Sequence, residues 1–578
     1  MDKKFLGVIG VMLVICLLIA GAAKNVKQTT GNNRDGSGNS NPAYAERFFD
    51  PDKVIDIQIA LSKADLEAMM ANPTKEEYHT ASVIVGGEKV DNVGFRIKGN
   101  SSLSSVARSD SERFSFKVDF DQYIEGQNLL GLTKLNLNNS FSDPSYMREY
   151  LSYSLLNQMK IPTPAFCYAN IYLNGELQGL YLAVEGIEEP FLERYYGSDY
   201  GNLYKAVGGQ GSDLKYTDEE IDSYSGLVLK TDTKNGTDAA LVAMVEALNR
   251  GEDLEKYLNV DEILRYFAVN AVLVNMDSYL GNMKHNYYLY EKDGQFSILP
   301  WDYNMSFGGF GMGREQSSTS LHIDAPLSGA TLAERPLLGK LLEVAEYKEL
   351  YHKYIEEFIK GPFALANMQQ EIDRVAAMIE PHLEKDPTKL YSMEQFEQAI
   401  AEGSTERNTE VQNDSKAVNS PVNSGGEATA KLGADGKETW PTVEQGQTPP
   451  QMEKGEIQPE RGGDGMMQGA AIGLVKFTRE RIDNVSQQLT GAVPVAENTS
   501  EPVQGNQEPG QPGKMGNRQG LPGDMEPPEG MQQGDQRMGN QGLPQTLSVQ
   551  QLYLIGGSII LLGAGLWLVL KKRTKYSI

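Results

Sequence analysis

Two long polar tracts limit the part of this 578-residue chain that can fold into a compact structure. Residues 403–470 are rich in Gly, Glu, Gln and Pro, and residues 492–548 in Gly, Pro, Gln and Met. Such segments bury too little apolar surface to offset the loss of chain entropy, so we predict that both are disordered. Apolar residues recur regularly from 46 to 400 and again over 472–489. We therefore predict one domain over 46–491, with 403–470 as an insertion and 492–548 as a tether.

The amino-terminal end carries an apolar run over residues 5–23, directly behind Lys3 and Lys4. A basic start, an apolar run and small residues near its end are typical of a secretory signal peptide. The run is long for this purpose, so an uncleaved signal anchor is the alternative interpretation of residues 1–23. Residues 24–45, rich in Asn, Gly and Ser, are predicted to be a flexible leader.

A second apolar run, residues 552–570, is long enough to form a transmembrane helix. A basic tail, residues 571–578, follows it directly. Because Lys and Arg favour the cytoplasmic side, we expect this tail to be cytoplasmic and the domain to face outward from the cell membrane. A buried core helix is the alternative interpretation of this run.

Composition argues against several classes of function. The chain has 53 Lys and Arg against 78 Asp and Glu, a net charge of −25. We expect no nucleic-acid partner, because binding to phosphates needs a basic surface. The two cysteines, Cys16 and Cys167, are too few for a disulfide framework or a cysteine-based zinc site. The five histidines lack HExxH spacing, which argues against a zinc hydrolase.

Strand patterns come first along the chain and helix patterns later. Two hairpins are expected, over 166–185 around Asn174-Gly175 and over 286–299 around Asp293-Gly294, because these dipeptides favour tight hairpin turns. Further strands are predicted over 54–60, 81–85, 93–98 and 114–120, and helices over 63–71, 145–159, 239–249 and 260–274. This order predicts an α+β fold with an N-terminal β-rich part and a C-terminal, mainly helical part.

The most informative pattern lies between residues 275 and 309. Asp277 is followed after four residues by Asn282, then by the second hairpin, and then by Asp302. Protein kinases place a catalytic Asp and a metal-binding Asn at this spacing, followed by a metal-binding Asp. The catalytic carboxylate takes a hydroxyl proton, and the amide and second carboxylate supply the oxygen ligands that Mg²⁺ prefers. The alternative is a helix cap at Asp277 and a turn at Asp302.

Residues upstream of this pattern follow the order found in kinases. A loop between two strands contains Gly99, Asn100 and Ser101, where a phosphate-covering loop is expected. Lys117 on the second of these strands and Glu149 on the next helix would form the pair that aligns the ATP phosphates. Lys98 and Lys134 are the alternatives to Lys117.

The end of the first hairpin has a further expected role. Glu185 precedes a linker into the helices, where a kinase hinge would bind adenine through its backbone groups. No Walker A motif is present, so a P-loop nucleotide-binding protein is not supported.

Together these stretches resemble the CotH-type spore-coat kinase family, atypical secreted kinases with a protein-kinase-like fold. The resemblance rests on five phrases that occur in family order: VGFRIKGNSS from Val93, FSFK from Phe114, YLNG from Tyr172, NLYK from Asn202 and WDYN from Trp301. Lys98 stands where the family often has Arg, and the insertion and C-terminal anchor are additions to the family pattern.

The resemblance implies roles for the candidate residues. Asp277 corresponds to the catalytic Asp, Asn282 and Asp302 to metal ligands, and Asn286 to a further metal or phosphate contact. Lys117 is chosen as the ATP-phosphate lysine. The implied activity is transfer of phosphate from ATP, with Mg²⁺ or Mn²⁺, to Ser or Thr of extracytoplasmic or envelope proteins. The alternatives are adenylylation at the same site, or an inactive surface scaffold or adhesin-like protein with this fold.

Overall fold

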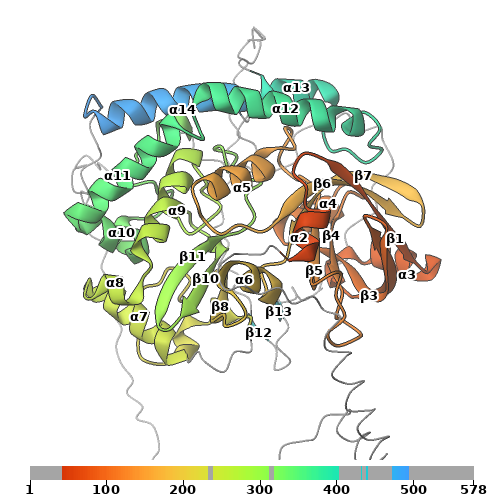
Figure 1. Ribbon diagram of the computed structural model, residues 1–578, viewed down its shortest axis with the longest axis horizontal. Coiled ribbons are helices and arrows are strands. Elements are labelled where there is room, and N and C mark those ends of the chain that lie inside the picture. Colours follow the sequence, from red (N-terminus) through yellow and green to blue (C-terminus); the bar gives the residue numbers. More distant parts are fainter. Residues whose placement is uncertain are drawn as a thin grey trace, which may run out of the picture. The chain divides into compact units, whose positions relative to one another are not determined.

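The computed structural model of the chain describes residues 42–231, 238–310, 318–401 and 472–493, with two short strands, β12 (Lys431–Leu432) and β13 (Glu438–Thr439) (Figure 1). The predicted segments 1–23, 492–548, 552–570 and 571–578 lie outside these residues, except for the first two positions of the tether. So does the predicted insertion apart from β12 and β13, which pair with each other. Within the described ranges, no helix is both long enough and apolar enough to cross a membrane.

Seven strands form a closed barrel in the first half of the described chain, which Figure 1 shows in red to orange. Their order is β1-β2-β3-β4-β5-β7-β6. Neighbouring strands are antiparallel except β1 and β6, whose parallel pairing closes the barrel. The strands are β1 (Val54–Leu61), β2 (His79–Val85), β3 (Glu88–Lys98), β4 (Ser115–Asp119), β5 (Lys134–Asn138), β6 (Phe166–Leu173) and β7 (Glu176–Glu185).

Side chains alternate between the inside and the outside of the barrel, as the two-residue period of a strand requires. Phe95, Phe116 and Leu137 on β3, β4 and β5 are fully buried in the apolar core of the barrel. The polar residues next to them in sequence therefore lie on the outer face of these strands. This outer face carries Lys98 and Lys117.

The two hairpins predicted from sequence are confirmed. β6 and β7 meet at Asn174-Gly175, and β10 (His285–Lys292) and β11 (Gln295–Pro300) meet at Asp293-Gly294. All four turn residues have positive φ, between 50° and 88°, which is the backbone conformation of a two-residue type I′ turn. Gly at the second position adopts it without the steric cost of a Cβ atom.

The second half of the described chain is mainly helical and contains a smaller antiparallel sheet, in the order β11-β10-β8-β9. α9 is buried along almost its whole length and packs against both α11 and β11, so it forms the centre of this half. The remaining elements here are β8 (Asn202–Val207), β9 (Leu227–Leu229), α5 (Arg148–Gln158), α6 (Glu189–Tyr196), α7 (Asp238–Arg250), α8 (Leu254–Tyr257), α9 (Val260–Leu273), α10 (Pro336–Glu343), α11 (Ala345–Lys360), α12 (Leu365–Leu383), α13 (Met393–Ile400) and α14 (Leu474–Leu489).

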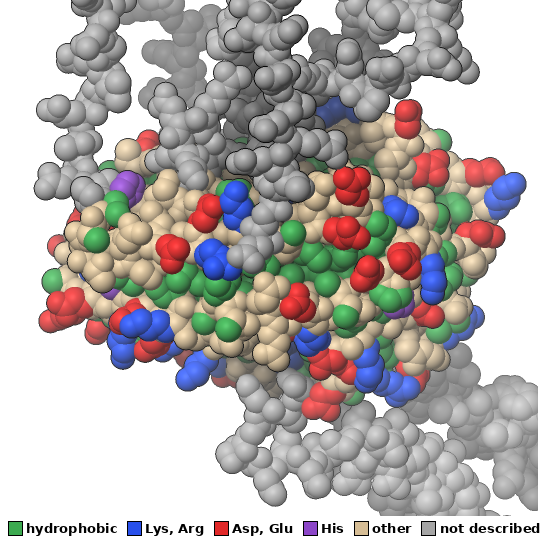
Figure 2. Space-filling view, turned by 90° about the horizontal axis from the view of Figure 1, so that it is seen from above, with side chains coloured by type: hydrophobic (Ala, Val, Ile, Leu, Met, Phe, Trp, Pro, Cys, Tyr) green, Lys and Arg blue, Asp and Glu red, His purple; other side chains and the backbone are tan. Residues whose placement is uncertain are grey.

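The helix predicted over 472–489 is present as α14, which packs beside α11 and α12 along one side of the molecule (Figure 1). Figure 2 views this side, where a band of hydrophobic side chains runs between charged ones. The fully buried Arg481 donates hydrogen bonds to main-chain oxygens of Ala271 and Val272 at the end of α9, and of Thr319 and Leu321. α14 therefore supplies hydrogen-bond donors to main-chain oxygens at the end of the central helix, α9.

Some local predictions were wrong. The predicted leader 24–45 overlaps α2 (Ala43–Phe48), whose Tyr44 is fully buried and donates a hydrogen bond to Glu185. The glycine- and serine-rich turn after β3 contains a short helix, α4 (Ser101–Ala107). The helix predicted from residue 145 begins at Arg148. Its start is delayed because Tyr146 has a φ of 56°, outside the helical region.

A buried ion pair joins the barrel to the C-terminal helices. Arg113, just before β4, lies 2.8 Å from the Asp386 carboxylate, and both side chains are fully buried. The same carboxylate accepts the main-chain N–H of Leu180 on β7 at 2.9 Å. A Cβ atom at Gly179 would lie within 2.4 Å of the carboxylate atoms, so only glycine allows this approach. The contact therefore fixes the segment after α12 against β4 and β7.

We expect Asp386→Ala to lower the free energy of unfolding by about 3–5 kcal/mol, because it leaves the Arg113 charge buried without a partner. Urea unfolding of the full-length protein, followed by tyrosine and tryptophan fluorescence, measures the change. Glu343→Ala is the control, since it removes a partly exposed ion pair with Lys340 and should leave unfolding close to that of the parent. Equal effects of the two substitutions would contradict the role given to Asp386.

Candidate functional site

Lys98, at the end of β3, lies where the barrel meets the second half of the chain, and we refer to the space shared by Lys98, Glu149, Asp277 and Asp302 as the cleft. Burial lowers the pKa of its ammonium group, and the negative charges of Asp302 and Glu149 act in the opposite direction. Its Nζ atom lies 5.7 Å from the centre of the Trp301 ring. Lys98 is thus the strand lysine that approaches the helix glutamate and the acidic residue after β11.

Glu149, in the first turn of α5, is buried and held by two side chains. Its Oε2 accepts a hydrogen bond from Asn138 Nδ2 at 2.8 Å, and its Oε1 accepts one from the Tyr153 hydroxyl at 3.1 Å. Burial raises the pKa of Glu149 to about 7, and the charge of Asp302 adds to the increase. The side chain is fixed in position from both α5 and β5.

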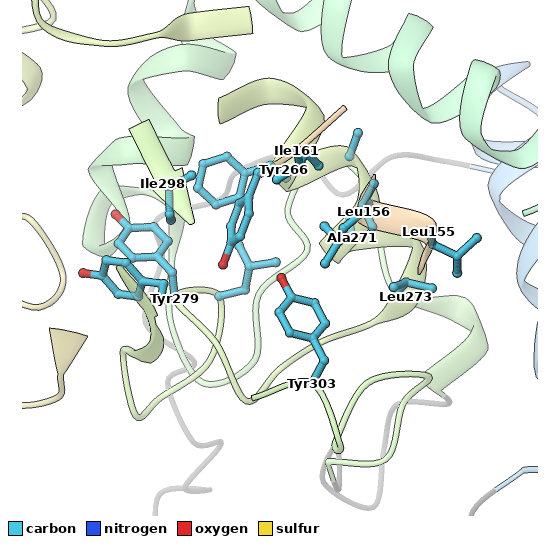
Figure 3. Close-up of a cluster of buried hydrophobic side chains, with 14 of the residues drawn as sticks. Leu155, Leu156, Ile161, Tyr266, Ala271, Leu273, Tyr279, Ile298 and Tyr303 are labelled. Carbon is cyan, nitrogen blue, oxygen red and sulfur yellow. The ribbon is translucent and has the colours of Figure 1, made fainter. Parts of the chain in front are cut away.

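Asp302 follows β11 directly and has a φ of 59°, in the left-handed region that Asp tolerates better than most residues. Its main-chain N–H donates to the Tyr153 hydroxyl at 3.1 Å. The next residue, Tyr303, points into the hydrophobic core, where its hydroxyl donates to Asn270 at 2.9 Å (Figure 3). Core packing on one side and Tyr153 on the other therefore hold Asp302 at the cleft.

Burial raises the pKa of the Asp302 carboxyl group, and the nearby charge of Asp277 raises it further, whereas Lys98 lowers it. Two carboxylates that repel each other in a buried cleft favour a bound cation or a proton. The electrostatics of Asp302 are therefore those expected beside a cation site.

Asp277 lies in the loop between α9 and β10, and two residues at the start of β10 orient its carboxylate. His285 Nε2 lies 2.7 Å from Asp277 Oδ1, and Asn286 Nδ2 donates to Asp277 Oδ2 at 3.1 Å and to its main-chain oxygen at 3.0 Å. The pairing of β10 with β8 shifts register between His285 and Tyr288. Such an irregularity re-aims side chains, and here both residues reach Asp277.

Burial lowers the pKa of His285, but its hydrogen bond to Asp277 and the negative charge there outweigh this effect, so the pKa is raised overall. The exposed fractions of the His285 and Asp277 side chains are 20% and 16%. The pair therefore lines the cleft without being sealed from solvent, as a group that must meet a substrate requires.

Lys117, predicted to pair with Glu149, has other neighbours. The charges that act on its ammonium group are those of Glu188, Lys134, Arg96 and Asp119. Lys117 lies opposite Arg96 in the β3–β4 ladder, whereas Lys98 lies opposite Ser115, two positions nearer the end of β3. The prediction was wrong because both lysines lie on the same outer face, and only the position of α5 distinguishes them.

Asn282, predicted to be a metal ligand, points away from the cleft. Its exposed side chain donates to the main-chain oxygens of Ser328 and Gly329 at 3.1 and 2.7 Å. The buried Arg335 bonds the main-chain oxygens of Tyr279 and Gly281 and fixes this course of the loop. The amide next to Asp277 belongs to Asn286 instead.

Glu185, predicted to mark an adenine-binding hinge, is a structural residue of the barrel. Its fully buried carboxylate bonds Tyr44, Arg194 and the N–H of Ala165. Its own N–H donates to the main-chain oxygen of Ala165 at 2.8 Å, and the next N–H, of Gly186, donates to that of Lys134 at 3.0 Å. These two N–H groups are therefore bonded within the fold, and an adenine-binding role for the other backbone groups of the linker stays a prediction.

Gly99, Asn100 and Ser101 lie directly after Lys98, at the rim of the cleft. Gly99 has a φ of 137°, and a Cβ atom there would lie 3.0 Å from the Leu103 Cβ. Asn100 precedes α4, and Ser101 is its first residue. The segment lies where the predicted phosphate-covering loop was placed, but as the start of a helix.

The donor set for a metal is sparse. Within residues 42–231, 238–310, 318–401 and 472–493, no group of three or more His, Cys, Asp and Glu side chains could hold a metal ion. Of the residues predicted as metal ligands, Asp302 offers its carboxylate and Asn286 its Oδ1, because Nδ2 of Asn286 bonds Asp277. A divalent ion there would need most of its ligands from a bound phosphate compound and water, as is usual for Mg²⁺.

Sequence reasoning missed three residues that shape the site. Tyr153 lies four residues after Glu149 on the same face of α5, and this spacing was an available signal. His285 immediately precedes Asn286 and could have been noticed as a polar pair at the start of a predicted strand. Asn138 had no sequence signal, because β5 itself was not predicted.

Comparison with known proteins identifies the family of the chain. The family model described as CotH kinase protein matches residues 95–413, more than half of the chain. This chain belongs to that family. The inner spore coat protein H of Bacillus subtilis (strain 168) is 25% identical over 299 residues, which cover 50% of this chain and 78% of that protein. An inner spore coat protein H-like protein of the same strain is 32% identical over 97 residues, covering 17% of this chain and 30% of that protein.

A solved structure of the Shewanella oneidensis HipA and HipB toxin–antitoxin system with operator DNA aligns with 58% of this chain and 82% of that chain. The sequence identity is 13% and the TM-score is 0.22. A TM-score this low does not show that the two proteins share a fold. Membership of the family rests on the sequence match, and the site rests on its own geometry.

The setting of Lys117 leads to a chemical prediction. Burial lowers the pKa of Lys117 to about 8, so a large fraction of its amine is neutral and nucleophilic near that pH. We expect acetic anhydride to label Lys117 with a midpoint near pH 8, whereas exposed lysines follow a pKa of about 10.4. Peptide mass spectrometry after brief labelling across this range measures the midpoint. Lys117→Arg identifies the peptide, and a midpoint above about pH 10 would contradict the setting described here.

Proposed function

We propose that the protein transfers the terminal phosphate of ATP to a Ser or Thr hydroxyl of a protein substrate. The observation that carries the proposal is the meeting of Lys98 and Glu149, from β3 and α5, with Asp277 and Asp302, which flank a hairpin in the other half. Protein kinases use a strand lysine, a helix glutamate, a catalytic aspartate and a metal-binding aspartate in this order along the chain. Membership of the CotH family supports this assignment.

The chain's own groups can perform each part of the transfer. Lys98 binds the phosphate chain, and Glu149 keeps the lysine directed toward it. The substrate hydroxyl oxygen forms a bond to the γ-phosphorus while the bond from that phosphorus to the β–γ bridging oxygen breaks, and ADP leaves. Asp277 accepts the hydroxyl proton. His285 and Asn286 keep the Asp277 carboxylate oriented for this step.

Asp302 and Asn286 would hold Mg²⁺ or Mn²⁺, because both offer the oxygen ligands that these ions prefer. The fit is supported by the buried carboxylate of Asp302, whose pKa is raised by burial and by the negative charge of Asp277 and lowered by Lys98. A divalent ion bound there would neutralise charge on the phosphate groups.

The proposed substrates are proteins outside the cytoplasm. This part of the proposal rests on the apolar runs 5–23 and 552–570 and on the basic tail after the second run, which together predict an outward-facing domain anchored in the cell membrane. A second candidate is a surface or coat scaffold that has lost transfer. The Bacillus relative is named an inner spore coat protein, and this name supports the scaffold as the second candidate.

Asp302 and Asp277 should be separable by role. We expect Asp302→Ala to abolish Mg²⁺-dependent ATP binding and transfer, because it removes the carboxylate that would hold the ion. Asp277→Ala should keep ATP binding and lower transfer by roughly 10²–10⁴-fold, the usual effect of losing a positioned acid or base. Calorimetric titration with ATP, with and without Mg²⁺, and transfer from γ-labelled ATP measure the two effects in the full-length protein.

An α-labelled ATP control distinguishes phosphate transfer from adenylylation, which would leave the α-label on the acceptor. If the parent protein binds no nucleotide, the kinase proposal fails and the scaffold remains. If Asp302→Ala binds Mg²⁺ and ATP like the parent, the metal assignment fails.

The two asparagines of the loop provide a matched pair of variants. Asn286→Ala removes both a ligand for the ion and a hydrogen bond to Asp277, so we expect transfer to fall by roughly 10-fold or more. Asn282→Ala removes only an exposed contact with Ser328 and Gly329 and should leave transfer near the parent rate. The labelled-transfer assay at saturating Mg²⁺ compares them. A larger loss of transfer for Asn282→Ala than for Asn286→Ala would restore Asn282 as the metal ligand, as its spacing from Asp277 predicted.

A further inference from the structure

Lys205, on β8 in the second half of the chain, lies close enough to the cleft for its charge to act on Lys98, His285 and Asp302. Its direct cross-strand neighbour on β10 is Tyr288, and such neighbours share one face of a sheet. The Tyr288 ring packs edge-on against Trp301, with centres 5.9 Å apart, and Lys98 lies over the same Trp301 ring at 5.7 Å. Lys205 and Lys98 therefore approach the same space from the two halves of the chain.

The charge of Lys205 reaches three groups of the site. It lowers the pKa of Lys98, of His285 and of Asp302. The negative charges that act on Lys98 are those of Asp302 and Glu149, whereas the hydrogen-bond partner of His285 is Asp277. Lys205 thus extends the positive charge of the cleft from the Lys98 side to the Asp277 side, where the acceptor hydroxyl would enter.

The ammonium group of Lys205 forms no ion pair or hydrogen bond with the part of the chain that the structure describes, and the residue is only half-buried. Two ammonium groups that repel each other within a cleft are stabilised by an anion between them. The Asp302 carboxylate is the first of the charges that act on Lys98, and Lys205 in turn acts on Asp302. A divalent ion bound to Asp302 would cancel its charge. A ligand with several negative charges, such as a polyphosphate chain, would restore the balance.

We propose that Lys205 binds the terminal phosphate of the nucleotide and stabilises its charge during transfer, while Lys98 binds the inner phosphates. This inference rests on the proposed function, and it assigns Lys205 to the terminal phosphate, which is the group transferred. A lysine suits the role because its ammonium group is a compact charge with three donors that can follow the phosphate as it moves.

The test compares nucleotides that differ only in the terminal phosphate. Lys205→Met, Lys205→Arg and the control Lys292→Met are titrated as full-length proteins with ATP and with ADP in the presence of Mg²⁺. Lys292 lies at the far end of β10, beside Asp199. We expect Lys205→Met to weaken ATP binding by roughly 10–100-fold, the effect of losing a charge-assisted hydrogen bond, and ADP binding far less. Lys205→Arg should recover part of the loss, and Lys292→Met should resemble the parent.

An equal loss for ATP and ADP, or no loss at all, would overturn the proposal. Thermal unfolding of each variant shows that it has folded, and Lys205→Gln replaces Lys205→Met if the latter does not fold. If the parent binds neither nucleotide, the proposed function fails, and titration with tripolyphosphate still decides the role of Lys205. Binding by the parent that is lost in Lys205→Met would support an anion site at Lys205. Absence of binding by the parent would reject it.

Discussion

The site depends on one buried hydroxyl group, that of Tyr153. It accepts the main-chain N–H of Asp302 and donates to Glu149, so it joins the residue after β11 to the helix that packs against β6 and α9. Without it, a buried amide and a buried carboxylate would each lose a partner, and each loss has a cost of about 1–3 kcal/mol. Because Tyr153 and Glu149 are one helical turn apart and Tyr153 binds Asp302, α5 sets the separation of Glu149 from Asp302. The electrostatics of Lys98 follow from that separation.

Sequence reasoning succeeded where structure is decided locally. Asn174-Gly175 predicts its hairpin because the turn itself requires positive φ at both residues. The closure of the barrel had no such signal, since the parallel pairing of β1 with β6 joins segments more than a hundred residues apart. The choice between Lys98 and Lys117 was equally inaccessible. Both lie on outward positions of adjacent strands, and only the packing of α5 and the course of the chain after β11 distinguish them.

The loop after α9 shows the same limit at the scale of a few residues. Spacing alone favoured Asn282, but the carbonyl groups of this loop are bound by Arg335, which lies more than fifty residues further along the chain. This contact turns Asn282 outward, while the irregular start of β10 brings Asn286 to Asp277. Asp277 and Asp302 needed no such information, because they flank a hairpin that the sequence predicted from its Asp293-Gly294 turn.

The return of α14 to the core has a consequence for synthesis on the ribosome. The main-chain oxygens of Ala271 and Val272 meet Arg481 only after about 210 further residues have been made. At about 5–20 residues per second, that interval lasts roughly 10–40 s. At the end of this interval, only the last helix that covers the end of α9 is still missing. A nascent chain that stalls before residue 474 would therefore expose this end of α9.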